Sequence, residues 1–126
     1  MNMRNLSIKN TNLTPSVNFR SNGELRIEGR SIPEDPESFY EPLFQWINEY
    51  FQDPKDSTRL DIQLEYINSG SSKFIMSFLK IFKDRFDEGK NISINWFYEE
   101  DDENLQELGV HYKTLLKIPF NLVEIM

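Results

Sequence analysis

Two stretches of strict alternation between apolar and polar residues do most to limit the folds open to this chain. Apolar side chains occupy every second position of residues 60–66 and again of residues 92–98. A period of two residues is typical of a β-strand with one buried and one polar face. Residues 75–86, between them, repeat apolar side chains at helical spacing. Strands covered on both faces read as continuous apolar runs, so we predict helices on one face of the sheet only.

The rest of the chain adds a hairpin and two more helices. Asn22-Gly23 separates alternating runs and predicts strands near 16–20 and 24–29, because both residues tolerate positive φ. Capping residues and prolines predict a helix that begins near Asp35 or Ser38 and ends before Pro54. Further helices are predicted over 70–88 and from Asp101-Asp102 to about 116. The last of these helices is expected to face inward with Leu105, Leu108, Tyr112 and Leu115. Further strands are predicted over 59–67, 91–98 and 120–125.

These elements follow the order β-β-α-β-α-β-α-β. Such alternation predicts an α/β domain with a mixed, mostly parallel five-stranded sheet and right-handed crossovers. We assign residues 14–126 to one domain and leave residues 1–13 as an N-terminal arm of uncertain order. Trp46 and Phe78 fall on the apolar arcs of their helices and are expected in the core.

The composition excludes several classes of function. A net charge of −7 argues against nucleic acid or an anionic membrane as the main partner. The absence of cysteine excludes disulfides, thiol catalysis and thiolate metal sites. The N-terminus lacks a signal-peptide core and no apolar run is long enough to span a membrane, so we expect a cytoplasmic protein.

Catalytic patterns are also missing from the sequence. His111 is the only histidine, no serine lies in a nucleophile-elbow pattern, and the five glycines are scattered. The acidic run 99–103 has oxygen ligands that suit Mg²⁺ or Ca²⁺, but not the spacing of a calcium loop. Acidic residues also favour a helix N-terminus for structural reasons. We therefore predict no enzyme and no cofactor, with a metal- or small-ligand-binding enzyme that uses 99–103 as the lesser alternative.

The candidate functional stretch is the corner from Tyr66 to Lys73, where a strand turns into a helix. Its small polar residues are Asn68, Ser69, Gly70, Ser71 and Ser72. Hydroxyl groups there can cap the helix by accepting bonds from its free N–H groups. The same N–H groups and the helix dipole favour a phosphate, either on a ligand or attached to a serine. Met76 and Ser77 lie outside the apolar arc of this helix and are candidate partner contacts.

Three runs of residues resemble the SiaC family of small bacterial regulatory phosphoproteins. They are Gly29–Pro42, Leu64–Ser69 and the pair Ser72-Lys73, and the resemblance extends over nearly the whole chain after Thr14. It implies a STAS-like fold, related in shape to anti-sigma-factor antagonists. The family's usual corner reads Asn-Thr-Ser-Ser. Here Asn68 matches its first residue, Ser69 stands where the phosphorylated threonine would be, and Gly70 replaces a serine.

The resemblance implies a non-enzymatic phosphorylation switch. A serine/threonine kinase would modify Ser69, with Ser71 as the alternative, and a PP2C-type phosphatase would remove the phosphate. The unmodified form would bind and activate a diguanylate cyclase, which places the protein in cyclic-di-GMP signalling. The rival hypothesis is a constitutive interaction scaffold of the same fold, in which Ser69 only caps its helix.

Overall fold

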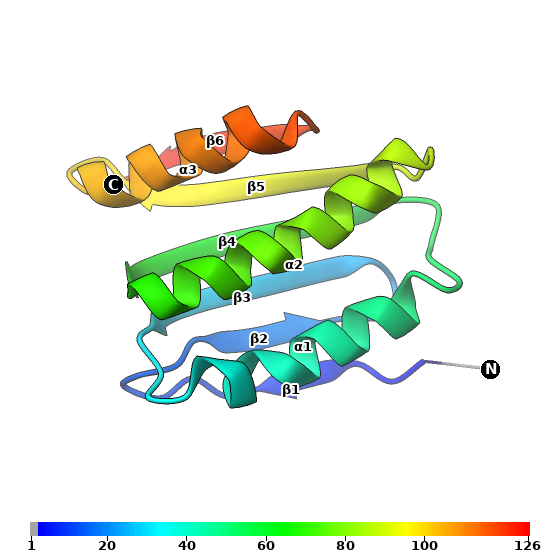
Figure 1. Ribbon diagram of the computed structural model, residues 1–126, viewed down its shortest axis with the longest axis horizontal. Helices are drawn as coiled ribbons and strands as arrows, with labels where there is room; N and C mark the ends of the chain where they lie inside the picture. Colours follow the sequence, from blue (N-terminus) through cyan, green and yellow to red (C-terminus); the bar gives the residue numbers. More distant parts are fainter. Residues whose placement is uncertain (1–2) are drawn as a thin grey trace.

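The computed structural model describes residues 3–126 and contains three helices and six strands (Figure 1). The strands are β1 (Leu6–Ile8), β2 (Ser16–Phe19), β3 (Glu24–Ser31), β4 (Thr58–Ile67), β5 (Ile92–Glu99) and β6 (Phe120–Ile125), and the helices are α1 (Pro36–Tyr50), α2 (Ser69–Asp87) and α3 (Glu103–Leu116). None of the helices in the described part of the chain is long and apolar enough to cross a membrane.

The strands form one sheet in the order of the sequence, β1-β2-β3-β4-β5-β6. Pairing is antiparallel for β1–β2 and β2–β3 and parallel from β3 to β6. Right-handed crossovers that all advance in the same direction place their helices on the same face of a sheet. All three helices do lie on one face (Figure 1). The predicted α/β class, the mostly parallel sheet and the one-sided helical layer are confirmed.

The predicted count of five strands is wrong by one. The additional strand is β1, in the segment that the sequence left as an N-terminal arm, and Leu6 pairs with Phe19 of β2. A strand of three residues is too short to display an alternating pattern. Trp46 also fixes this N-terminal segment to α1, because its Nε1 donates a hydrogen bond to the carbonyl of Arg4 at 2.7 Å.

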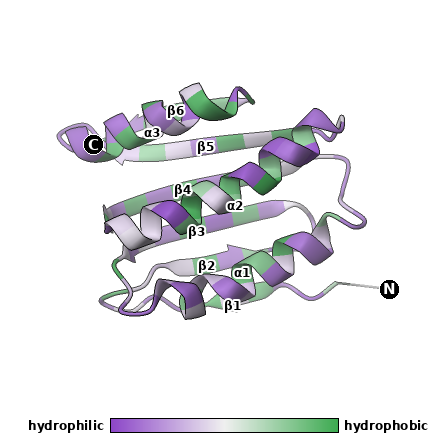
Figure 2. Ribbon diagram, viewed as in Figure 1, coloured by the Kyte–Doolittle hydropathy of each residue, from purple (hydrophilic) through white to green (hydrophobic). Residues whose placement is uncertain are grey.

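The hydrophobic core fills the space between the sheet and the helices and is rich in aromatic rings. Trp46 and Phe78 are buried, as predicted. The Phe78 ring stacks on Phe19 of β2 and meets Phe44 of α1 edge-on, at centroid separations of 5.8 and 5.6 Å. Figure 2 shows hydrophobic and hydrophilic residues alternating along the strands, as a sheet with one covered face requires.

The inward face of α3 differs from the prediction. Leu115 is 50% exposed and Leu116 is buried in its place, while Leu108 is only half-buried. The cause is Gly109, which is itself buried against β5. A Cβ atom at Gly109 would lie 2.5 Å from Cδ1 of Trp96, so the helix approaches the sheet through a residue without a side chain. The helix is therefore rotated relative to the stripe that its leucines suggest.

The second difference is a β-bulge at the end of β4. The pairing of β3 with β4 shifts register so that Gly29 faces Leu64 but Arg30 faces Tyr66. Glu65 is thus the additional residue, and it turns Tyr66 from the covered face to the open face. Tyr66 is 58% exposed, although the alternation predicted that it would point inward. Elsewhere on the open face Asn95 donates a hydrogen bond to Asp61 at 2.9 Å and accepts one from Asn121 at 3.0 Å.

Candidate functional site

The corner between β4 and α2 is capped by Asn68. Its side-chain Oδ1 accepts a hydrogen bond from the backbone N–H of Ser71 at 2.8 Å, and its carbonyl accepts from Ser72 at 3.0 Å. The backbone N–H of Asn68 donates to the carbonyl of Ser31 at 3.2 Å, which fixes the corner to the end of β3. Asn68 has an extended backbone (φ −92°, ψ 168°), the usual conformation of an N-cap residue.

Ser69 is the first residue of α2, and it is exposed. Its hydroxyl makes no hydrogen bond within residues 3–126, so the hypothesis that this serine caps the helix is wrong. The backbone N–H groups of Ser69 and Gly70 also have no partner within that range. These are the donors that every helix leaves free at its start.

Ser71 lies on the opposite side of the same turn and is fully buried. Its hydroxyl has no hydrogen-bond partner in the described structure. It lies beside the Tyr40 hydroxyl, which shares a short, buried hydrogen bond with Ser31. Burial raises the pKa of Tyr40 to about 12, although the neighbouring hydroxyls of Ser31 and Ser71 act in the opposite direction. Ser69 and Ser71 are two residues apart but stand in very different environments.

Two neighbouring helices hold the first turn of α2. The hydroxyl of Tyr112 on α3 donates to the carbonyl of Ser72 at 3.0 Å. On the other side Gly70 lies against the start of α1, where an added Cβ would be 3.3 Å from Cγ of Pro36. A glycine at position 70 therefore suits this close approach. The contribution of Tyr112 carries no local signal in the sequence, because the residue lies 40 positions from Ser72.

The outer surface of α2 carries Ser69, Lys73 and Ser77, which are spaced by one helical turn and are all exposed. We refer to these three residues as the α2 stripe. Met76, expected to be an exposed contact, is instead half-buried and packs against the hydrophobic core. Its partial burial places it beside the stripe, not in it.

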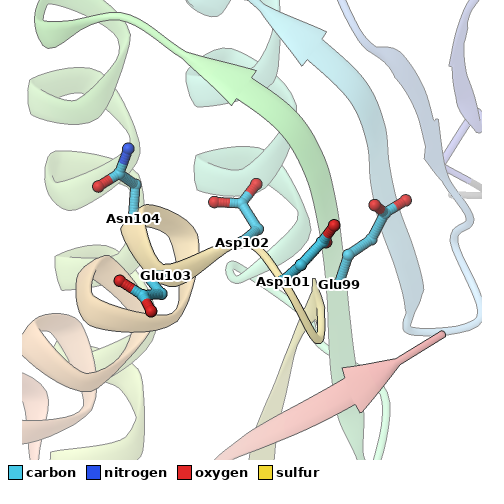
Figure 3. Close-up of a pocket in the computed structure, with 5 residues that line it drawn as sticks. All are labelled: Glu99, Asp101, Asp102, Glu103 and Asn104. Carbon is cyan, nitrogen blue, oxygen red and sulfur yellow. The ribbon is translucent and has the colours of Figure 1, made fainter.

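The acidic loop between β5 and α3 has a structural role at one position. Oδ1 of Asp102 accepts from the N–H of Leu105 at 3.1 Å and caps α3. Glu99, Asp101, Asp102, Glu103 and Asn104 line an open depression of about 370 Å³. Their side chains point in different directions (Figure 3). In the described part of the chain no group of three or more His, Cys, Asp or Glu side chains lies close enough to hold a metal ion.

Comparisons with known proteins agree with this architecture. Residues 8–125 match the model of the SiaC family regulatory phosphoprotein. An uncharacterised protein of Pseudomonas aeruginosa (strain UCBPP-PA14) is 27% identical over 119 residues, which cover 94% of each chain.

Solved structures agree as well. SiaC of Pseudomonas aeruginosa superposes with a TM-score of 0.91 at 25% identity, over 98% of this chain and 100% of that chain. SiaC in the crystal structure of the diguanylate cyclase SiaD in complex with its activator SiaC, also from Pseudomonas aeruginosa, gives 0.90 at 26% identity, over 95% and 99%. Because the family model matches residues 8–125, which is nearly all of this chain, the chain belongs to the SiaC family of regulatory phosphoproteins.

Proposed function

We propose that this chain is a non-enzymatic regulatory protein that binds a diguanylate cyclase and is switched by phosphorylation of Ser69. A serine/threonine kinase adds the phosphate and a PP2C-type phosphatase removes it. The observation that carries the proposal is the exposed hydroxyl of Ser69, which lies at the start of α2 and makes no hydrogen bond within residues 3–126. The solved complex of SiaC with the cyclase SiaD supports the choice of partner.

Accessibility favours Ser69 over Ser71. A kinase must bring the acceptor hydroxyl into its own active site, and the Ser71 side chain is fully buried beneath the first turn of α2. Reaching it would require that turn to open, with loss of the Asn68 cap and of the Tyr112 hydrogen bond. Ser69 can be modified with the turn in place.

A phosphate on Ser69 is compatible with the fold. It adds about −1.5 to −2 charges at neutral pH, next to the free N–H groups of Ser69 and Gly70 and at the positive end of the helix dipole. Lys73 lies one turn further along the α2 stripe. Such an interaction stabilises an exposed helix start by only ~0.3–1 kcal/mol. Phosphorylation therefore acts on binding and hardly on stability.

The direction of the switch follows from the surroundings of Ser69. We place the docking surface for the cyclase on the α2 stripe, beside Met76. Lys73 is the one basic residue among the three that define the stripe, and Arg30, near the carboxyl end of β3, already contacts Glu65 at 3.6 Å. Without an arginine cluster, burial of a phosphate in an interface costs several kcal/mol. A penalty of about 3–4 kcal/mol weakens binding by more than a hundredfold, which releases the partner.

Isothermal titration with the diguanylate cyclase of the same organism tests the proposal. Ser69→Ala should bind like the unmodified protein, Ser69→Asp should bind more weakly, and the phosphorylated protein should bind most weakly. Ser77→Arg should weaken binding without affecting phosphorylation, and it probes the stripe more cleanly than a change at half-buried Met76. Ser57→Asp is the matched control, because Ser57 is exposed before β4 at the other end of that strand.

Three results would contradict the proposal in different ways. Tighter binding by the phosphorylated form would reverse the direction of the switch. Full phosphorylation of Ser69→Ala by the kinase would move the acceptor to another residue, with Ser71 the first to examine. Mass spectrometry that finds no phosphate on protein from its own cells, under any condition in which cyclase binding changes, would favour the constitutive scaffold.

A further inference from the structure

We propose that the depression beside Tyr66 on the open face of the sheet is a docking site for the kinase that modifies Ser69, and that it receives a basic side chain next to an apolar one. The inference rests on the proposed function and adds a second surface to it. The depression has a volume of about 300 Å³ and lies across the ends of β4, β5 and β6. We call it the Tyr66 depression and define it by Arg30, Tyr66, Phe97, Glu99, Asp102 and Ile125.

The first supporting observation is the exposure of Tyr66. The bulge at Glu65 interrupts the regular pairing of β3 with β4 and points the Tyr66 side chain toward solvent, where it is 58% exposed. The Arg30 guanidinium lies over the ring at 5.2 Å from its centroid, and Arg30 Nε lies 3.6 Å from a carboxylate oxygen of Glu65. The ring thus lies against the Arg30 guanidinium, which is itself paired with Glu65. Tyrosine and arginine are the residues most often found at the energetic centre of protein interfaces.

The second observation is the charge around the depression. Glu99 and Asp102 line it and also line the neighbouring acidic depression, together with Asp101 and Glu103. None of these four carboxylates forms an ion pair in the described chain. They do not converge on a metal position either. Dispersed, unpaired carboxylates beside an aromatic wall complement a lysine or arginine flanked by an apolar side chain.

The third observation is position, which selects the kinase as the occupant. Tyr66 precedes Ser69 by three residues, a separation of at most roughly 11 Å along an extended chain. Asn68 between them is bonded to the carbonyl of Ser31, the residue after Arg30. A kinase seated on the Tyr66 depression therefore has Ser69 within reach. None of the residues that line the depression belongs to the α2 stripe, so a contact there leaves Lys73 and Ser77 uncovered.

Steady-state phosphorylation by the kinase of the same organism tests the site. A residue that only helps to dock the substrate changes KM and leaves kcat unchanged. Tyr66→Ala should raise KM roughly tenfold to thirtyfold, in the range of an interface hot spot, while Tyr66→Phe should remain close to wild type. The double variant Glu99→Lys/Asp101→Lys, which spares the cap Asp102, should raise KM roughly tenfold. Its KM should also lose the increase with salt that the wild-type protein shows.

Two controls match these changes. Leu115→Ala removes an apolar side chain of similar exposure from α3, and Glu49→Lys reverses an exposed charge near the end of α1. Both should leave KM unchanged. Wild-type KM for Tyr66→Ala and the double variant, or a loss in kcat alone, would overturn the inference while the proposed function stands. Failure of the kinase to modify Ser69 in the wild-type protein would refute the proposed function, and the docking site would fall with it.

Discussion

Asn68 caps α2 and the Ser69 hydroxyl does not, so alanine substitutions at the two positions should change the free energy of unfolding by different amounts. Asn68→Ala removes the side-chain oxygen that accepts from Ser71 N–H at 2.8 Å. Loss of an N-cap of this kind typically costs ~1 kcal/mol, within a range of about 0.5–2. Ser69→Ala removes a hydroxyl without a partner in the described structure, at an exposed first-turn position where alanine is a good helix former. Its free energy of unfolding should stay within about 0.5 kcal/mol of wild type.

Urea denaturation and thermal melts of the two variants separate these cases. A chain of this length has an unfolding entropy that makes 1 kcal/mol equal to about 4 °C in Tm. We therefore expect Asn68→Ala to melt about 4 °C lower and Ser69→Ala to melt within about 2 °C of wild type. The phosphorylated protein should also stay close to wild type. A loss in Ser69→Ala as large as that in Asn68→Ala would show that the Ser69 hydroxyl has a structural role, and the accessibility argument for the switch would fail.

Two further predictions concern the buried part of the molecule. Phe78→Ala removes a ring that is 1% exposed and should lower the free energy of unfolding by ~3–5 kcal/mol in urea melts, whereas a loss below about 1 kcal/mol would contradict its place in the core. Stability should also fall as the pH rises from about 10 to about 12, because the unfolded chain releases the Tyr40 proton at its ordinary pKa near 10 while burial keeps it bound in the folded protein. Burial also raises the pKa of Tyr112, so Tyr40→Phe should reduce that slope without abolishing it, and an unchanged slope would count against the burial of the Tyr40 hydroxyl.

The sequence predicts most of the fold because hydrophobic periodicity records which face of each element is covered. The strands from 16 to 125 and all three helices were expected close to their observed bounds. The discrepancies arise where a residue has no side chain to report its burial, or where the register changes. Gly109 faces the core without adding to the apolar pattern of α3, and the helix is rotated accordingly. Glu65 interrupts the alternation of β4 by one residue, which moves Tyr66 to the other face.

The candidate site was predictable in place but not in detail. Its position follows from the local change of period between β4 and α2 and from the polar residues there. Which residue caps, which hydroxyl is exposed and which is buried depend on contacts with Ser31, Pro36 and Tyr112, all distant in sequence. A linear pattern holds no information on such contacts. The same limit applies to Arg30 and Tyr66, which meet only because β3 and β4 are paired in parallel.

The topology explains why the proposed phosphate acceptor, Ser69, is accessible at this corner. Strands β3 to β6 are parallel and lie side by side in the order of the sequence. The three helices that connect them therefore all start at the carboxyl ends of the strands, on one face of the sheet. The start of a helix has free backbone N–H groups. The carboxyl ends of the strands, where these helices start, adjoin both the helical layer and the open face of the sheet. Ser69 lies at that border, as the first residue of the α2 stripe and three residues after exposed Tyr66. Under the proposed function, a phosphate on Ser69 would alter the α2 stripe directly, and the kinase would dock on the Tyr66 depression, which shares no residue with that stripe.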